Sequence, residues 1–125
     1  MDITPLVRQG AQVIQSYAGG RFRISGTLYE GAVIVFPDHT MSWSFSDSVA
    51  DLKIEDFDLL SQSEGIDVVL LGTGKNFQFI VPDLRKTLKE RGLSVDAMDT
   101  GAACRTYNVL LAEGRRVAAM LLPVL

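Results

Sequence analysis

The second half of the chain alternates between apolar runs and amphipathic segments, and this alternation constrains the fold more than any other feature of the sequence. In the segment 67–71, every residue after Asp67 is apolar, which is typical of a strand that is covered on both faces. The segments that follow predict a helix, a strand, a second helix and a last strand, at 82–92, 93–98, 100–114 and 117–122. Because this order needs two crossover connections, we expect the three strands to pair in parallel.

The two predicted helices carry recognisable end signals. Pro82 opens the first helix, Leu84 and Leu88 share one of its faces, and Gly92 supplies a left-handed stop. Thr100 can cap the second helix by accepting a hydrogen bond from a backbone N–H group. These signals support the positions of both helices.

The first half of the chain predicts β-structure. Phe22 and Ile24 alternate with polar residues, and residues 32–36 form a β-branched apolar run that Pro37 ends. Beyond a turn at 37–40, Trp43 and its apolar neighbours alternate with serines. We therefore expect an antiparallel meander.

A short helix is predicted between the two halves, at 49–64, with negative charge in its first turns. The chain has 125 residues, a usual size for one domain with one hydrophobic core. Together the patterns predict an α+β, α/β-like fold in a single domain, 1–125, with an N-terminal meander and a C-terminal β-α-β-α-β portion. The acids of the predicted helix are Asp51, Glu55, Asp56 and Asp58.

Charge and composition make several classes of protein unfavourable. The net charge of −3 gives no basic surface for sequence-independent binding of nucleic acid or anionic lipid. Since no apolar run reaches the roughly 18 residues that a membrane helix needs, we expect a cytoplasmic protein without an integral membrane segment. Cys104 and His39 are the only residues of their types, so no disulfide and no Cys/His zinc site is expected from this chain alone. His39 is better explained as a turn residue than as a general base.

One block of the sequence, together with shorter matches, resembles a known family. The block is Asp-Thr-Gly-Ala-Ala-Cys-Arg-Thr-Tyr-Asn-Val-Leu at 99–110, followed by Glu-Gly-Arg at 113–115. Gly72–Gly74 and positions from Tyr17 onward extend the similarity over nearly the whole chain. The family is a small domain family that includes mitochondrial respiratory complex I assembly factor three and many short bacterial proteins.

The resemblance implies both a fold and a kind of function. It implies a three-layer β/β/α fold. For the mitochondrial member it implies a non-enzymatic role in early complex I assembly beside a partner assembly factor, and it implies neither a reaction nor a cofactor. The function predicted for this chain is therefore an interaction module for a respiratory complex subunit or another assembly factor, in an oligomeric state that the sequence leaves open.

The parallel pairing predicts where a binding site would lie. If the strands at Val68 and Val95 are parallel, their carboxyl ends bring the Gly-Thr-Gly segment close to Thr100. That edge of an α/β sheet is where ligands usually bind, and the N–H groups of Gly101 and Ala102 would favour an anion or a partner's carboxylate. The predicted partner or ligand surface comprises Gly72, Thr73, Gly74, Thr100, Cys104, Arg105 and Asn108.

A purely structural role is an alternative to a functional role at each of these positions. The Gly-Thr-Gly segment lacks the third glycine of a dinucleotide fingerprint, so a tight turn is favoured over nucleotide binding. Arg105 and a helix start would lower the pKa of the Cys104 thiol, yet a small buried residue is the favoured interpretation because no base accompanies it. Arg105 and Asn108 are equally compatible with holding a loop and with facing a partner. The alternative function is accordingly a small-molecule or anion-binding domain, or an unrecognised enzyme, that uses the sheet edge near Cys104 and Arg105.

Overall fold

The computed structural model of the chain describes residues 10–45, 48–63 and 65–125. In that part of the chain the strands form two sheets. Sheet A is antiparallel, in the order β1-β2-β3, and sheet B is mixed, in the order β5-β4-β8-β6-β7. The strands are β1 (Ile14–Ala18), β2 (Arg21–Ile24), β3 (Thr27–Glu30), β4 (Val33–Val35), β5 (Thr40–Ser42), β6 (Val68–Gly72), β7 (Val95–Met98) and β8 (Val117–Leu121). The helices are the 3₁₀ helices η1 (Val49–Asp51) and η2 (Ile54–Phe57) and the α-helices α1 (Asp58–Gln62), α2 (Pro82–Glu90) and α3 (Thr100–Ala112).

Sheet B contains the two parallel crossovers predicted from the second half of the sequence. β6 lies between β7 and β8 and pairs in parallel with both, so Leu71 stands opposite Ala97 on one side and Met120 on the other. The α2 helix connects β6 to β7, and α3 connects β7 to β8. The carboxyl ends of these three strands therefore share one edge of the sheet. We call this edge the rim; it comprises residues 72–74, 98–100 and 122.

The β-structure of the first half is divided between the two sheets, where the sequence analysis predicted one meander. The β1 strand, which the sequence pattern does not predict, joins β2 and β3 in sheet A. The β4–β5 hairpin instead belongs to sheet B, because β4 pairs antiparallel with β8. Gly31 separates β3 from β4 with a φ of 79°, a conformation that glycine adopts without steric cost, and it redirects the chain between the layers.

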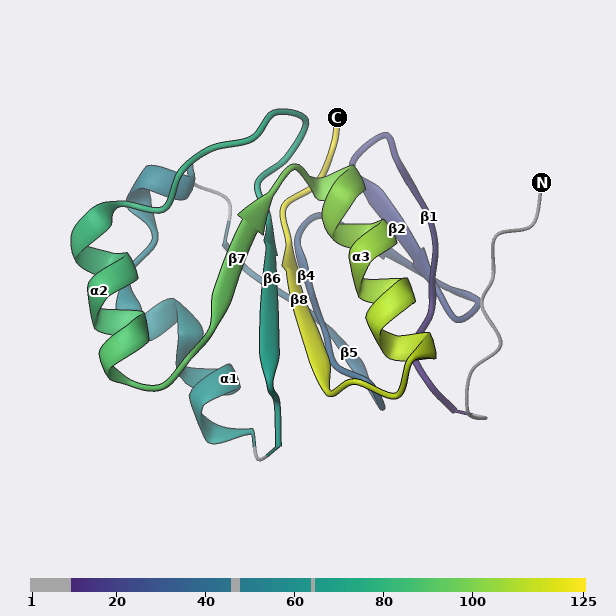
Figure 1. The fold of residues 1–125 in the computed structure, drawn as a ribbon. Coiled ribbons are helices and arrows are strands. Elements are labelled where there is room, and N and C mark those ends of the chain that lie inside the picture. The colour runs from purple at the N-terminus through teal and green to yellow at the C-terminus, as the bar shows by residue number, and fades with distance from the viewer. Residues whose placement is uncertain (1–9, 46–47, 64) are drawn as a thin grey trace.

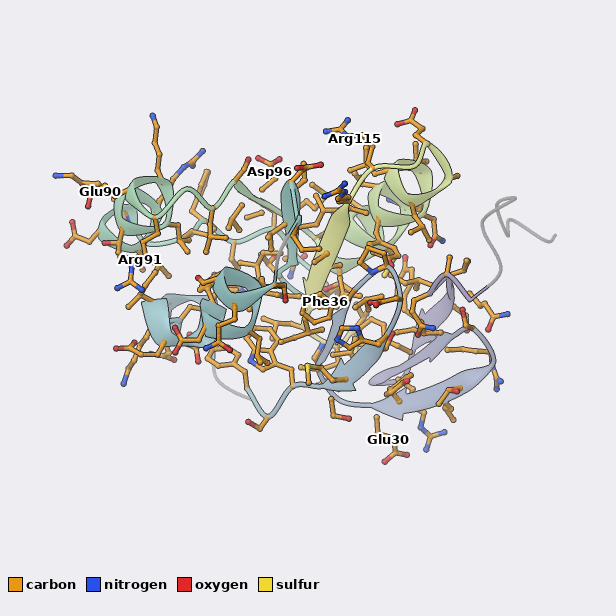
Figure 2. All side chains as sticks on the ribbon, turned by 90° about the horizontal axis from the view of Figure 1, so that it is seen from below. Glu30, Phe36, Glu90, Arg91, Asp96 and Arg115 are labelled. Atoms are coloured by element: carbon orange, nitrogen blue, oxygen red, sulfur yellow. The ribbon has the colours of Figure 1, made fainter. Side chains whose placement is uncertain are left out.

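The molecule has three layers, with sheet B in the middle. On one face, sheet A and α3 lie side by side and share a core that contains Phe22 and Tyr107. On the other face, α1 and α2 cover a second core that contains Phe57 and Leu88. The view from below in Figure 2 separates the same layers, with α1 and α2 on one side of sheet B and sheet A and α3 on the other. The β/β/α layering is confirmed, with α3 placed beside the outer sheet.

The segment predicted as one helix at 49–64 is broken into short pieces. The Asp51 carboxylate accepts a hydrogen bond from the N–H group of Ser48 at 3.3 Å, and that of Asp56 accepts one from the N–H group of Lys53 at 2.8 Å. Leu52, between the two turns, has an extended backbone with φ −62° and ψ 138°. Each acid thus closes a turn of its own, and only α1 is α-helical.

The other two helices agree closely with the sequence analysis. Pro82 is the first residue of α2, and Gly92 follows its end with a φ of 77°. The α3 helix begins at Thr100 and has 13 residues. Among the described residues, no helix combines the length and the apolar character that crossing a membrane requires.

Candidate functional site

Thr100 ties the carboxyl ends of β6 and β8 together at the rim. Its hydroxyl accepts a hydrogen bond from the N–H group of Gly74 at 2.9 Å and donates one to the carbonyl oxygen of Leu122 at 2.7 Å. Its own N–H group donates to the carbonyl oxygen of Gly74 at 2.9 Å. The structure thus brings the Gly-Thr-Gly segment and the start of α3 into direct contact. Because Thr100 is fully buried, these bonds are shielded from water and hold the rim rigidly.

Gly72 allows this close approach because it has no side chain. A Cβ atom at this position would lie 2.9 Å from the Thr100 hydroxyl oxygen and 2.9 Å from a methyl carbon of Leu121. Both distances are shorter than real Cβ contacts, so a side chain at position 72 would force Thr100 or Leu121 to move. The predicted explanation of the glycine turn as a close backbone approach is therefore confirmed at Gly72.

Thr73 shapes the loop that leaves the rim. Its hydroxyl donates a hydrogen bond to the carbonyl oxygen of Asn76 at 2.7 Å and accepts one from the N–H group of Gln78 at 3.1 Å. The next helix begins only at Pro82, so no helix N-terminus follows the glycine turn directly. A dinucleotide site needs that N-terminus to bind the pyrophosphate. In this turn the Thr73 hydroxyl bonds to the backbone of the same loop instead.

The loop at 75–81 exposes apolar side chains beside the rim. Phe79 is 76% exposed and Phe77 is 47% exposed, and their rings meet edge to face with centroids 4.6 Å apart. Val81 is also exposed. Figure 1 shows this loop and the C-terminal residues at the same end of the molecule. Neighbouring exposed aromatic rings are typical of surfaces that bind another molecule.

A hollow of about 590 Å³ lies between this loop and the ends of the sheet B strands. One wall contains Trp43 and Phe45, whose rings are stacked with centroids 5.0 Å apart. Thr73 and Gly74 of the rim also line the hollow. The remaining lining residues are Glu30, Gly31, Ala32, Ser44, Ser48, Val49, Lys75, Asn76, Gln78, Leu122, Pro123 and Leu125.

Cys104 is buried in the core between α3 and the two sheets, away from this hollow. Only 3% of its surface is exposed, and burial raises the pKa of the thiol to about 12 although Arg105 acts in the opposite direction. The predicted lowering of the thiol pKa is therefore wrong, because desolvation outweighs the neighbouring charge. The predicted role as a small buried residue is confirmed, and the structure gives the alternative function based on this thiol no support.

Asn108 holds the first strand of sheet A against α3. Its side-chain oxygen accepts a hydrogen bond from the N–H group of Ile14 at 3.0 Å, and its side-chain nitrogen donates one to the carbonyl oxygen of Ile14 at 2.8 Å. The side-chain amide thus forms with the backbone of Ile14 the pair of hydrogen bonds that a neighbouring strand would form. Arg105 is exposed on the same helix. Cys104, Arg105 and Asn108 therefore lie along α3 and not in the hollow.

The N-terminus of α3 is capped differently from the prediction. Asp99, and not Thr100, is the N-cap residue, and its carboxylate accepts a hydrogen bond from the N–H group of Ala102 at 2.9 Å. The Thr100 hydroxyl is unavailable for capping because it bridges two strand ends. The chain's own carboxylate thus occupies the position predicted for an anion or a partner's carboxylate.

His39 lies in the hairpin turn between β4 and β5, as predicted. Its ring stacks on Phe36 with centroids 4.4 Å apart, and its Nδ1 atom lies 2.7 Å from the Asp38 carboxylate. In the described ranges, no three His, Cys, Asp or Glu side chains gather closely enough to hold a metal ion.

The aromatic residues of the site are not predicted from the sequence. The pattern places Trp43 in a strand, but Trp43 and Phe45 lie beyond the end of β5 and line the hollow. Phe77 and Phe79 belong to no predicted helix or strand. The available signal was a run of apolar residues after a glycine turn, too short for a helix and directly before the proline that opens α2.

The sequence is similar to curated proteins of two kinds. An uncharacterised protein of Rhodobacter capsulatus is 36% identical over 115 residues, which cover 92% of this chain and 87% of that protein. The NADH dehydrogenase (ubiquinone) 1 alpha subcomplex assembly factor 3 of Xenopus tropicalis is 32% identical over 124 residues, which cover 97% of this chain and 67% of that protein. The chain spans 61% of the Bos taurus protein of the same name, so these assembly factors are longer.

The fold recurs in related structures. The crystal structure of a Bartonella henselae protein described as an outer membrane protein is 36% identical and superposes with a TM-score of 0.81, covering 93% of this chain and 98% of that one. Residues 14–122 match the family described as proteins of unknown function, DUF498/DUF598. The resemblance carried by residues 99–110 is thus confirmed, and the chain belongs to the DUF498/DUF598 family.

Proposed function

We propose that this protein is a non-enzymatic interaction module that assists assembly of the respiratory NADH dehydrogenase. In this proposal it binds a subunit of the complex or another assembly factor. The contact surface is the exposed loop at 75–81, which the buried rim supports.

The observation that carries the proposal is the similarity to assembly factor 3, which extends over 97% of this chain at 32% identity. Similarity of that extent includes both sheets and the rim, so a shared way of binding is a reasonable inference. The bacterial relative from Rhodobacter capsulatus is uncharacterised, and the assembly role therefore comes from the longer relatives.

The geometry of the rim supports binding to a protein better than binding to a metabolite. Phe77 and Phe79 project from a loop whose base is fixed by Thr73 and Thr100, so they are presented on a rigid support. Aromatic side chains carry much of the energy of protein interfaces.

Co-purification at native expression levels tests this function. We expect the wild-type protein to retain subunits or assembly factors of the NADH dehydrogenase, and we expect the Phe77→Ser/Phe79→Ser variant to lose them. Leu28→Ser is the matched control, because Leu28 is 49% exposed on sheet A, outside the proposed surface. Recovery of no respiratory protein, together with normal NADH dehydrogenase activity in cells deleted for the gene, would overturn the proposal.

A further inference from the structure

The hollow beside the rim has an apolar wall and a polar mouth. Trp43, Phe45 and Leu122 provide apolar surface, and the rings of Trp43 and Phe45 are stacked. Lys75, Asn76 and Gln78 line the side formed by the loop and carry side-chain N–H groups. An occupant should therefore have an apolar part for the wall and hydrogen-bond acceptors for the mouth.

The side chains that line the mouth include one cation and one acid. Lys75 is the cation among these residues and Glu30 is the acid. The guanidinium of Arg21 lies 3.2 Å from the Glu30 carboxylate and offsets its charge. Figure 2 shows Glu30 projecting outward from sheet A. The ammonium group of Lys75 is thus the charge that the lining offers to an occupant.

The volume of the hollow fits a short stretch of polypeptide. About 590 Å³ falls within the roughly 300–1,000 Å³ that ligand pockets occupy, enough for a few side chains.

We infer that this hollow receives a segment of the partner protein in which an aromatic or leucine side chain lies next to an aspartate or glutamate. The apolar side chain packs between the Trp43–Phe45 wall and the Gly74 backbone, and the carboxylate meets Lys75. This inference rests on the proposed function, since it specifies the chemistry of the partner at the same surface. The exposed Phe77 and Phe79 rings then extend the contact beyond the hollow.

Two variants separate the two parts of the contact. Ser44 is exposed and lines the hollow, so Ser44→Phe places a bulky ring at the hollow without removing a core side chain. Lys75→Glu reverses the charge of an exposed side chain and should leave the fold intact. The matched controls are Ser16→Phe and Lys89→Glu, which make the same changes at exposed positions of β1 and α2.

Selection from a random peptide library on the immobilised full chain provides the probe. We expect the enriched peptides to share an aromatic residue or leucine beside an acid, and we expect synthetic copies to change the fluorescence of Trp43, the one tryptophan of the chain. Ser44→Phe and Lys75→Glu should each weaken binding by about tenfold, with the controls unchanged. Lys75→Glu should instead favour peptides in which a lysine replaces the acid.

Four results would overturn the inference. Three of them are a library that yields no binder, binders that tolerate Ser44→Phe, and binders whose affinity does not respond to Lys75→Glu. A fourth is binding of free phenylacetate as tightly as the best peptide, since the hollow would then be a small-carboxylate site. These measurements use no respiratory protein, so they are independent of the co-purification. If the peptide experiment fails and the co-purification succeeds, only the partner chemistry is rejected. If the peptide experiment succeeds and the co-purification fails, only the assembly role is rejected.

Discussion

The hydroxyl of Thr100 receives a hydrogen bond from the backbone nitrogen of Gly74, 2.9 Å away, and this contact joins the start of α3 to the end of β6 across 26 residues of sequence. The same hydroxyl donates to the carbonyl oxygen of Leu122 at the end of β8. One buried side chain thus fixes the place where two parallel strands and a helix meet.

Replacement of Thr100 by valine should destabilise the protein strongly. Valine keeps the shape of the side chain but leaves the Gly74 N–H group and the Leu122 carbonyl group without this partner. We expect the free energy of unfolding, measured by urea denaturation, to fall by about 2–4 kcal/mol. Thr106→Val, at a half-buried position on the same helix, is the control and should cost less than about 1 kcal/mol. Equal losses of unfolding free energy in the two variants would show that the hydrogen bonds of Thr100 add no particular stability.

Gly72→Ala tests the close approach at the rim. The added Cβ atom would lie 3.0 Å from the backbone Cα atom of Thr100, so the helix and the strand must move apart. We expect a loss of about 1–3 kcal/mol in the free energy of unfolding, together with shifts of the Gly74 and Thr100 amide signals in NMR spectra. An unchanged stability would mean that the rim yields easily, which disagrees with the buried hydrogen bonds there.

Asn108→Asp should release β1 from α3. An aspartate can still accept the Ile14 N–H bond, but it cannot donate to the Ile14 carbonyl group, and it places a carboxylate in a buried position. We expect faster hydrogen exchange at the Ile14 amide than in the wild type. The exchange rates of the β6 amides should change less than that of Ile14. Arg105→Ala on the exposed side of α3 is the control, with no expected change at Ile14.

The Cys104 thiol gives the protein a pH-dependent stability above neutrality. Burial raises its pKa to about 12 in the folded state, whereas the unfolded thiol ionises near 9. A pKa raised on folding contributes stability that is complete below the unfolded value and is lost as pH rises, because only the unfolded chain releases the proton. Between pH 8 and pH 10 the wild type should therefore lose about 1 kcal/mol more of its free energy of unfolding than Cys104→Ala. Parallel pH profiles for the two proteins would contradict the burial of the thiol.

Local patterns of sequence predicted the parts of the fold that local physics determines. The apolar run in β6 and the helix end signals at Pro82 and Gly92 depend only on neighbouring residues, and the structure agrees with them. The antiparallel pairing of β4 with β8 joins Val33 to Leu121, and nothing near either residue indicates that contact. The division of the meander between two sheets follows from that pairing and was missed for the same reason.

The candidate site was predictable to a similar extent. The meeting of Gly74 with Thr100 follows from parallel strands, and it could be inferred once the crossovers were recognised. The burial of Cys104 depends on sheet A packing over α3, and the hydrogen bonds between Ile14 and Asn108 that fix this packing connect residues 94 positions apart. The hollow was not predictable, because its walls come from separate parts of the chain, including Trp43 and the loop at 75–81.

Site-specific photo-crosslinking in living cells tests the central claim most directly. A photoreactive amino acid at position 79, which is 76% exposed, should form a crosslink to a subunit or assembly factor of the NADH dehydrogenase. The same amino acid at position 28, on the outer side of sheet A, should not. Crosslinks to such a protein from position 28 and none from position 79 would contradict the assignment of the loop at 75–81 as the binding surface.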